Sequence, residues 1–311
     1  MAKEVEPGKH LLVATTGGHL AQLVKLSAGL GSDPDSLWVT FRTPQSESLL
    51  VGRRVFFVPY VGSRDLGPAA KALALMMKHI EWRKESFVSA VSTGAAVGVV
   101  GLIAARLHGV PAFYVESVSR VDGPTVSGRI ASVVPGIQTY CQHEGWASRR
   151  WKYRPGMLLD GYAKCTRAEN PRPRLFVTLG TNKSYRFDAL VDAVLATGLA
   201  DERTVWQLGM TKREGLPGTV LEHLSSEEFE MCARDADVVI THAGVGTLMN
   251  LLDMGIYPLV VPRRARRREA VDDHQSQIAD LLARRDIALI AEADELGPDA
   301  IITASAAQII P

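Results

Sequence analysis

The sequence has little that would place it in a specialised class. Among its 311 residues only three are cysteines, Cys141, Cys165 and Cys232, and they lie far apart. Such scattered cysteines form neither a disulfide framework nor a CxxC metal site, and they fit a reducing cytoplasm. The formal net charge is +1, from 35 basic and 34 acidic residues, which argues against a general nucleic-acid-binding protein.

Long hydrophobic runs are also missing. No uninterrupted apolar stretch reaches the roughly 18–20 residues that a membrane-spanning helix needs. Charged residues crowd the N-terminus, so we expect no secretory signal there. Hydrophobic residues nevertheless make up 46% of the chain, a share typical of globular proteins. The composition predicts a soluble, cytoplasmic protein of two domains, or of one large domain.

The sequence does contain a repeated unit, which is a short apolar run, a glycine-rich turn and a helical stretch. His10–Thr15 predicts a buried strand, Thr16-Gly17-Gly18 a turn, and His19–Leu30 a helix with apolar residues at helical spacing. Strands that alternate with helices indicate parallel sheets covered by helices. Such sheets bind ligands at the carboxyl ends of their strands, which is where the glycine-rich turns lie.

A proline-rich stretch, Asn170–Pro173, interrupts this alternation, which then starts again. Its two prolines disfavour helix on both sides. The sequence therefore predicts an α/β protein of two Rossmann-like, doubly wound domains that face a cleft. We place the domains at residues 1–169 and 170–311.

Three strand ends in the first half carry candidate site residues. Glycines before His19 let the backbone approach a ligand, and His19 could act as a general base, unless it is incidental to a tight turn. The small residues Ser92-Thr93-Gly94 permit either ligand approach or close helix packing. Glu116 could be a base, a hydroxyl ligand or an orienting partner of His19. It could equally cap the next loop or pair with Arg120.

The second half contains the most specific pattern. His242–Thr247 places a histidine and a glycine turn at a helix N-terminus, which suits a diphosphate. Gly255–Pro262 predicts a strand that ends in proline. Asp273-His274-Gln275 then opens another helix with side chains that can bind hydroxyls. Three polar blocks at neighbouring strand ends are improbable as packing alone.

These motifs resemble family 28 glycosyltransferases, which have the GT-B fold. The second half is similar to their donor-binding domain, found in the transferase that makes lipid II and in the catalytic subunit of the eukaryotic enzyme that extends dolichol diphosphate N-acetylglucosamine. The first half resembles that enzyme's membrane-recruiting subunit. Residues 261–275 resemble a Pro-Arg-rich loop of bacterial two-subunit exopolysaccharide enzymes. The two halves look fused in this chain. The motifs of the first half are Gly17-Gly18-His19, Ser92-Thr93-Gly94, Tyr114-Val115-Glu116-Ser117 and Ser127-Gly128-Arg129.

The resemblance implies an inverting glycosyltransferase of cell-surface polysaccharide synthesis. It would move a hexose, an N-acetylhexosamine or a uronic acid from a UDP-sugar to a polyprenyl-diphosphate-linked saccharide. No cofactor and no metal would be required, and we find no Asp-x-Asp placed for a Mn²⁺–diphosphate complex. Helix dipoles and side-chain donors would then stabilise the leaving UDP.

The resemblance also assigns roles to residues. The expected catalytic residues are His19, as the base, and Glu116. The expected donor-binding residues are Gly180, Thr181, His223, His242, Gly244, Val245, Gly246, Thr247, Asn250, His274 and Gln275. The expected acceptor-binding residues are Gly17, Gly18, Ser92, Thr93, Gly94, Ser117 and Arg120. Asn250 stands where the family usually has a ribose-binding Glu, so ribose binding is weaker here or passes to Asp253.

Two segments suggest contact with an anionic membrane surface. Leu66–Arg83 predicts either an interfacial amphipathic helix or a core helix of the first domain. The basic stretch Arg263–Arg268 could face lipid, the acceptor diphosphate or an anionic donor sugar, or could be only a solvated loop. We expect a cytoplasmic protein peripheral to the inner face of a bacterial plasma membrane. No nucleic-acid partner is expected, and homo-oligomerisation stays open.

Two other functions stay open. UDP-sugar 2-epimerases share the fold but need no acceptor, so isomerisation of a UDP-sugar by the protein alone would indicate an epimerase. A non-catalytic scaffold subunit, for which Asn250 is the only hint, need not bind UDP.

Overall fold

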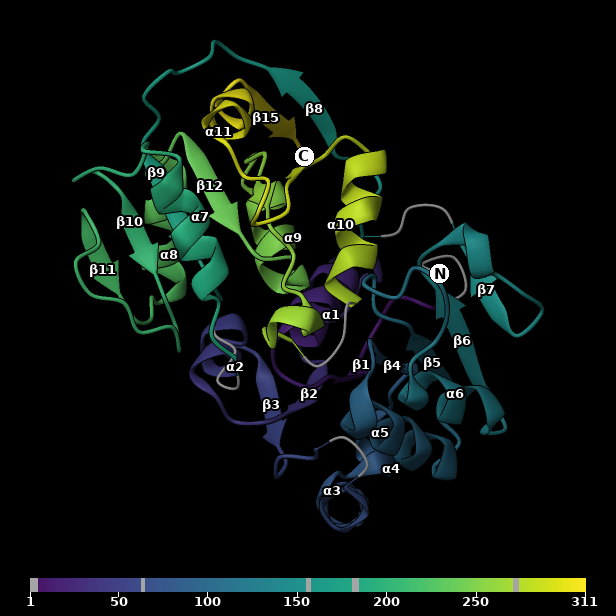
Figure 1. Ribbon diagram of the computed structural model, residues 1–311. Coiled ribbons are helices and arrows are strands. Elements are labelled where there is room, and N and C mark those ends of the chain that lie inside the picture. The colour runs from purple at the N-terminus through teal and green to yellow at the C-terminus, as the bar shows by residue number, and fades with distance from the viewer. Residues whose placement is uncertain (1–4, 63–64, 155–157, 181–184, 271–273) are drawn as a thin grey trace. The chain divides into compact units, whose positions relative to one another are not determined.

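The computed structural model describes residues 5–62, 65–154, 158–180, 185–270 and 274–311. The chain divides into two compact units, Met1–Asp160 and Gly161–Pro311. Each unit is built on a parallel sheet with helices packed against it (Figure 1). The predicted α/β class, with two Rossmann-like domains, is confirmed.

The first unit contains a seven-stranded sheet of order β3-β2-β1-β4-β5-β6-β7, in which all neighbours are parallel. The order reverses between β1 and β4, and such a switch point is where doubly wound sheets bind ligands. The strands are β1 (His10–Val13), β2 (Leu37–Thr40), β3 (Arg54–Phe57), β4 (Ser89–Ser92), β5 (Ala112–Val115), β6 (Ile137–Cys141) and β7 (Trp151–Tyr153). The helices are α1 (Gly18–Gly29), α2 (Pro44–Leu49), α3 (Leu66–His79), α4 (Trp82–Glu85), α5 (Ala95–Leu107), α6 (Val126–Val133) and the 3-10 helix η1 (Glu144–Trp146).

The second unit repeats this strand order in a six-stranded parallel sheet, β11-β10-β9-β12-β13-β14, with its switch point between β9 and β12. The strands are β9 (Leu175–Thr178), β10 (Val205–Gln207), β11 (Thr219–Leu221), β12 (Val238–Thr241), β13 (Leu259–Val260) and β14 (Leu289–Ile290). The helices are α7 (Asp188–Ala196), α8 (Ser226–Asp235), α9 (Val245–Asp253), η2 (Ala265–Arg267), α10 (His274–Arg284) and α11 (Pro298–Ser305).

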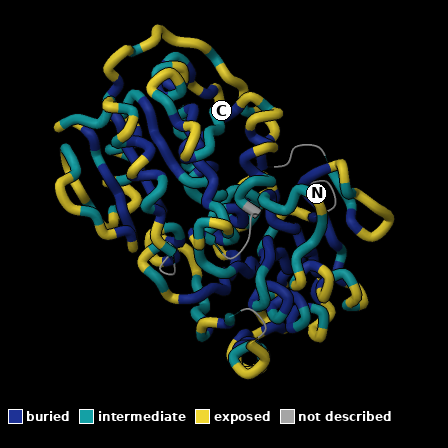
Figure 2. Tube along the Cα trace, in the orientation of Figure 1, coloured by how far each residue is buried: buried dark blue, intermediate teal, exposed yellow. Residues whose placement is uncertain are grey.

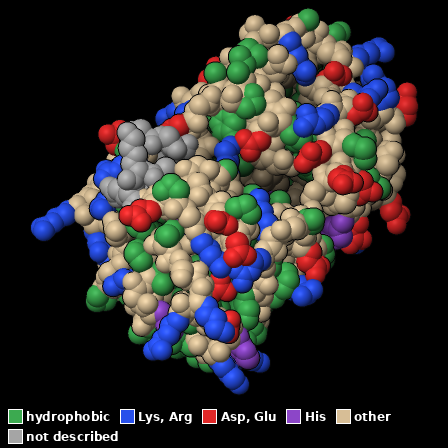
Figure 3. Space-filling view, turned by 180° about the vertical axis from the view of Figure 1, so that it is seen from behind, with side chains coloured by type: hydrophobic (Ala, Val, Ile, Leu, Met, Phe, Trp, Pro, Cys, Tyr) green, Lys and Arg blue, Asp and Glu red, His purple; other side chains and the backbone are tan. Residues whose placement is uncertain are grey.

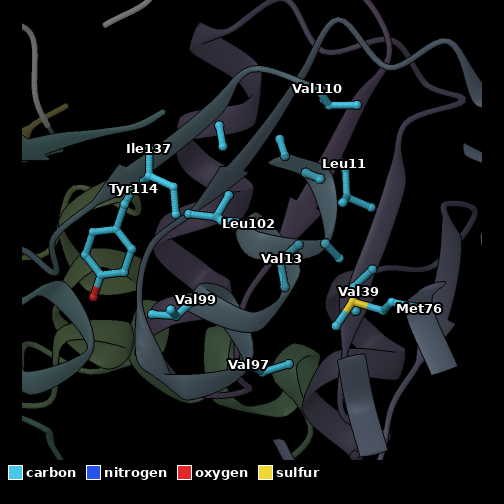
Figure 4. Packing of buried hydrophobic residues seen from close by; sticks show 14 of the residues in the cluster. Leu11, Val13, Val39, Met76, Val97, Val99, Leu102, Val110, Tyr114 and Ile137 are labelled. Atoms are coloured by element: carbon cyan, nitrogen blue, oxygen red, sulfur yellow. The ribbon is translucent and has the colours of Figure 1, made fainter. Parts of the chain in front are cut away.

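Each sheet buries a separate core on each face, because successive strand residues point to opposite sides. Along the first strand, Leu11 and Val13 pack with α3 and α5, whereas Leu12 and Ala14 pack with α1. Figure 4 shows Leu11 and Val13 in one cluster with Leu102 of α5. The strands are therefore mostly buried in Figure 2, and the exposed residues lie mainly on helices and loops.

Small residues bring α5 very close to the sheet. A Cβ atom added to Gly98 would lie 2.1 Å from the Ser92 hydroxyl oxygen, and one added to Gly101 would lie 2.7 Å from a Val13 methyl carbon. Glycine is needed at both positions. Close packing is thus one use of the small-residue stretch that begins at Ser92.

The boundary between the units differs from the predicted one at 169/170. The segment that follows residue 160 contains β8 (Ala163–Thr166), which pairs antiparallel with the last strand, β15 (Ala307–Ile310). Farther on, the Asn170 N–H donates to the Ser305 hydroxyl at 2.9 Å. These hydrogen bonds attach the predicted linker to the second unit, so the division falls at 160/161.

The predicted amphipathic segment Leu66–Arg83 forms two helices, α3 and α4, rather than one. Ala72 and Met76 of α3 are buried in the core that α3 shares with α5. Leu66 is 83% exposed and Met77 36% exposed. The core-helix alternative therefore describes one face of α3, and the other face is open. No helix in the described residues is long and apolar enough to cross a membrane.

The basic stretch Arg263–Arg268 is largely paired within its own unit. Arg263 is buried, Arg264 pairs with Glu292, and Arg267 donates to Glu292 at 3.3 Å. The stretch is therefore much less cationic at the surface than its composition suggests. On the face drawn in Figure 3, Lys and Arg side chains are interspersed with Asp and Glu side chains rather than gathered into one patch.

Candidate active site

His19 lies in the first turn of α1, where the chain leaves β1. Its Nδ1 atom is 2.7 Å from the carbonyl oxygen of Thr93, at the end of β4, and the Thr93 hydroxyl donates to the His19 carbonyl at 2.6 Å. A carbonyl oxygen only accepts, so Nδ1 carries the proton and Nε2 the lone pair. His19 is therefore held in the tautomer that a general base needs.

The surroundings of His19 keep its ring neutral. Burial lowers the pKa of His19, the Thr93 carbonyl raises it in part, and the positive charge of Arg120 lowers it again. Arg120 lies in the loop after β5, where its N–H donates to the Ser117 carbonyl at 2.9 Å. At neutral pH, Nε2 is thus free to accept a proton.

Glycine at position 94 makes room for the His19 ring. Gly94 has φ 130°, which L-residues rarely adopt, and a Cβ atom there would lie 2.6 Å from Cε1 of His19. Gly94 also precedes α5 without a side-chain cap, as Gly17 precedes α1. The Gly17 N–H donates instead to the side chain of Gln45, at 2.6 Å. Both turns need glycine for conformation or space.

Glu116 is buried at the end of β5, and its carboxylate fastens the following loop. It accepts from the Ser117 N–H at 3.1 Å, the Thr125 N–H at 2.8 Å and the Thr125 hydroxyl at 3.0 Å. Burial raises the pKa of Glu116, and these hydrogen bonds oppose that rise. A Cβ atom on Gly128 would lie 2.2 Å from the carboxylate. Of the predicted alternatives, loop capping describes these contacts, and Thr93 rather than Glu116 holds His19.

The expected acceptor residues fall into two groups. Ser92, Thr93, Gly94 and Ser117 are buried, so their contacts are with the protein. The Ser92 hydroxyl, for example, accepts from the Gly94 N–H at 3.2 Å. The partly exposed positions are Gly17, Gly18 and Arg120, which lie with His19 around the β1–β4 switch point.

His242 lies at the switch point of the second unit, at the end of β12, the strand that corresponds to β4 rather than to β1. A Cβ atom on Gly180 would lie 2.4 Å from its Cε1 atom, and one on Gly244 would lie 2.2 Å from its Nε2 atom. The ring is therefore held between two glycines from neighbouring strand ends. Burial, helped by the charge of Arg263, lowers the pKa of His242 to about 3, so the ring is neutral at physiological pH.

Helix α9 begins beside His242 and presents open backbone donors. It follows Gly244 without a side-chain cap, whereas Thr125 caps α6 and Ser225 caps α8. The N–H groups at the start of a helix are left without helical partners, and the helix dipole adds positive potential there. The expected donor residues Val245, Gly246 and Thr247 form this first turn. It is suited to a phosphate group.

The other expected donor residues are less concentrated. Gln275 opens α10, and its Oε1 atom accepts from the Arg263 N–H at 3.0 Å. Asn250 is partly exposed on α9, and His223 is exposed, 3.5 Å from Glu222. Asp253 accepts the Tyr162 hydroxyl at 2.5 Å, so it already has a structural partner. Thr181 and the side chain of His274 lie outside the described residues.

Two buried glutamines near His19 were absent from the predicted site. Gln22 donates to the Ser117 hydroxyl at 3.1 Å and accepts from the Val118 N–H at 2.9 Å. Gln142 donates to the Glu116 carbonyl at 2.9 Å. Gln22 follows His19 by one helical turn, and a polar residue among the apolar positions of α1 was a signal for it. No group of residues that could hold a metal ion occurs within the described part of the chain.

The chain is similar in sequence to known glycosyltransferases. The profile of the glycosyltransferase family 28 C-terminal domain matches residues 175–301. The chain is 25% identical, over 94% of its length and 85% of the relative, to the UDP-N-acetylglucosamine--N-acetylmuramyl-(pentapeptide) pyrophosphoryl-undecaprenol N-acetylglucosamine transferase of Parasynechococcus marenigrum (strain WH8102). It is 35% identical, over 25% of its length and 39% of the relative, to the UDP-N-acetylglucosamine transferase subunit ALG13 of Cryptococcus neoformans.

A solved structure extends the likeness across both units. The crystal structure of Acinetobacter baumannii MurG matches with a TM-score of 0.57 and 19% identity, over 95% of this chain and 89% of that one. The class of protein is therefore that of the GT-B glycosyltransferases, which consist of two Rossmann-like domains. Within it, the chain is a family 28-like glycosyltransferase, and residues 175–301 form its family 28 C-terminal domain.

Proposed function

We propose that this chain is an inverting glycosyltransferase with a UDP-sugar donor and a polyprenyl-diphosphate-linked saccharide acceptor. The names of its relatives, which specify UDP-N-acetylglucosamine and a pyrophosphoryl-undecaprenol acceptor, support both substrate classes. The transferred sugar is a hexose, an N-acetylhexosamine or a uronic acid, and the product serves cell-surface polysaccharide synthesis.

The observation that carries the proposal is the uncapped start of α9 next to His242. Its N–H groups and helix dipole favour an anion, and Gly180 and Gly244 leave room for the His242 ring beside them. In a transfer from a nucleoside diphosphate sugar, negative charge develops on the leaving diphosphate. This end of α9 would stabilise that charge and so favour the departure of UDP.

His19 supplies the base. Its Nε2 atom takes the proton of an acceptor hydroxyl while the oxygen of that hydroxyl bonds to C1 of the donor sugar. The bond from C1 to the diphosphate oxygen breaks, its electron pair leaves with UDP, and the configuration at C1 is inverted. The hydrogen bond from Nδ1 to the Thr93 carbonyl would stabilise the imidazolium that forms. We propose that the partly exposed Arg120 attracts the diphosphate of the acceptor.

We propose that transfer needs no divalent metal, because α9 and the neighbouring side chains supply the positive potential. Prolonged treatment with EDTA should leave the transfer rate unchanged, and Mn²⁺ or Mg²⁺ should not raise it. A rate that collapses in EDTA and returns with Mn²⁺ would refute this part of the proposal.

We further propose that the protein is peripheral to the cytoplasmic face of a membrane, to which the first unit binds. The exposed face of α3 carries Leu66 and Met77, and α6 exposes Val126, Ile130 and Val133 at helical spacing. Vesicles with anionic lipid should sediment the protein, and neutral vesicles should do so much less. An Ile130→Ser, Val133→Ser variant should bind them more weakly, whereas the same exchange at exposed Met231 on α8 should not.

The central experiment offers purified protein a panel of UDP-sugars with polyprenyl-diphosphate-saccharide extracts. Transfer of label from one UDP-sugar to the lipid fraction, with release of UDP, is expected. Isomerisation of a UDP-sugar without any acceptor would instead assign the epimerase function. Calorimetry that detects no UDP binding would indicate a scaffold subunit.

A further inference from the structure

Arg263 lies just beyond β13 and is only 2% exposed. Its guanidinium makes four hydrogen bonds, all to backbone carbonyl oxygens: one from Nη2 to Leu179 at 2.8 Å, and three from Nη1 to Tyr185, Arg186 and Glu269 at 3.2, 3.0 and 3.2 Å. These carbonyls belong to the end of β9, to the approach to α7 and to the loop after η2. One side chain thus fastens three stretches that are distant in sequence.

All of these stretches adjoin the donor site. Leu179 precedes Gly180, whose lack of a side chain makes room for His242. The Arg263 N–H also donates to Oε1 of Gln275, which leaves the NH₂ group of that amide as the available donor. Arg263 therefore connects the glycine turn after β9 with the first turn of α10.

The charge of Arg263 is not neutralised by these contacts. Within the described residues, it makes no ion pair with a carboxylate. The Glu269 carboxylate accepts instead from the Arg264 N–H and from Arg267. The Nε atom of Arg263 is buried without a hydrogen-bond partner, and its guanidinium carbon lies 4.8 Å from the centre of the Phe187 ring. Burial lowers the pKa of Arg263 to about 10, although the charge of Glu269 opposes this shift, so the group stays protonated at neutral pH.

A buried charge without a counterion is unfavourable unless something else stabilises it. Backbone carbonyls solvate the guanidinium here but contribute no net negative charge, and the Glu269 carboxylate, which also binds the Arg264 N–H and Arg267, offsets the effect of burial only in part. The remaining positive potential acts on its surroundings: burial is the main cause of the lowered pKa of His242, and the charge of Arg263 lowers that pKa further. An anion bound at the start of α9 would feel that potential in a low-dielectric environment, where it is weakly screened.

We propose that Arg263 is a positioning residue of the donor site, which holds its loops together and supplies a fixed positive potential for the donor diphosphate. It acts without touching the donor, through the field and through the three stretches that it fastens. This inference rests on the proposed function, because it takes the ligand to be a nucleoside diphosphate. It also separates Arg263 from Arg264, Arg266 and Arg267 of its stretch, which pair with acids.

The test compares binding of UDP and UMP by calorimetry in Arg263→Gln, which loses the charge, and Arg263→Lys, which keeps it. Arg266→Gln is the matched control, since Arg266 belongs to the same stretch but its side chain is 65% exposed. We expect Arg263→Gln to weaken UDP binding by about tenfold or more and UMP binding by less. Arg263→Lys should retain the preference for UDP over UMP, and the control should match the wild type.

Unchanged UDP binding in a folded Arg263→Gln variant overturns the proposal, as does an equal loss of UDP and UMP. If Arg263→Gln does not fold, the Arg263→Lys variant provides the test. This variant keeps the charge, so loss of its preference for UDP over UMP would contradict the proposed role of the charge. If the wild type binds neither UDP nor UMP, the proposed function fails separately. Inorganic pyrophosphate then replaces the nucleotides, and binding by the wild type but not by the charge-free variant still supports Arg263.

Discussion

The two units place a histidine at the same kind of strand end but hold it in different ways. His19 follows β1 and has a partner for Nδ1 at 2.7 Å, the Thr93 carbonyl. His242 follows β12, and the Thr241 hydroxyl is 3.5 Å from its Nδ1 atom. A hydrogen bond fixes the His19 ring, whereas the His242 ring is held between two glycines and is kept neutral by burial and by the charge of Arg263. The comparison indicates that one backbone architecture can hold a neutral histidine in two ways, which suit the base and the anion site that we propose.

Replacing His19 should have the largest effect. His19→Gln removes the proton acceptor, so kcat should fall about 10²–10⁴-fold while the Kd for UDP stays near the wild-type value. Transfer assays and calorimetry measure the two quantities. A variant that keeps most of its kcat, or that also loses UDP binding, would contradict the proposal that His19 serves proton transfer and His242 serves UDP binding.

Replacing His242 should have the next largest effect and a different signature. His242→Gln should weaken UDP binding and lower kcat about 10²-fold, since a group beside the leaving diphosphate is lost. Circular dichroism should show that the fold persists. UDP binding equal to that of the wild type would mean that His242 serves only to pack the turn.

The glycines that hold the two rings allow a matched pair of substitutions. Gly94→Ala and Gly180→Ala would each place a Cβ atom against a histidine, at 2.6 and 2.4 Å, in backbone with φ 130° and 76°. Each should cost about 1–3 kcal/mol in the free energy of unfolding. Gly94→Ala should mainly lower kcat, and Gly180→Ala should mainly weaken UDP binding.

Gly52→Ala is the control for backbone strain, because Gly52 has a positive φ of 73°, close to that of Gly180, and no atom within 4 Å of the added Cβ. It should lower stability through backbone strain and leave transfer unchanged. If all three variants have the same activity, the rings do not depend on these glycines.

The smallest predicted effect is a shift in the pH profile. Protonated His19 is inactive as a base, so kcat/KM should rise with pH through a pKa that lies below the ordinary value of 6.5. Arg120→Gln removes a positive charge that lowers this pKa, so the acid limb should move to higher pH. Arg83→Gln, on α4, is the control. A limb that stays in place or moves to lower pH would exclude coupling between Arg120 and His19.

Much of the fold is readable from the sequence because strands buried on both faces form short apolar runs and the turns carry glycine. The antiparallel pair of β8 and β15 was not predicted. Most of β8 is exposed, so it has no apolar run, and its partner lies at the other end of the unit. A pairing of that kind depends on tertiary contacts. The same contacts explain why the units divide at 160/161 and not at the predicted 169/170.

The candidate site could be predicted in part from the sequence, because its residues lie at strand ends, as the glycine-rich turns indicated. The hydrogen bond that selects the tautomer of His19 could not be predicted, because it comes from a carbonyl that is 74 residues away and any residue type supplies a carbonyl. Arg263 stands among other arginines and so resembled a surface residue. Its burial depends on carbonyls that only the folded chain brings together.

The helices that begin without a side-chain cap also show where the stability of the protein can be raised. A side-chain cap at a helix N-terminus contributes about 1 kcal/mol, and α9 forgoes it at the position where a ligand is proposed to bind. Adding a cap at Gly244 would compete with that ligand and collide with His242. Gly297, which precedes α11, has an extended backbone and free space around its Cβ position. Gly297→Ser should therefore raise the melting temperature, because it adds a side-chain cap to α11 and leaves the proposed anion site at α9 unchanged.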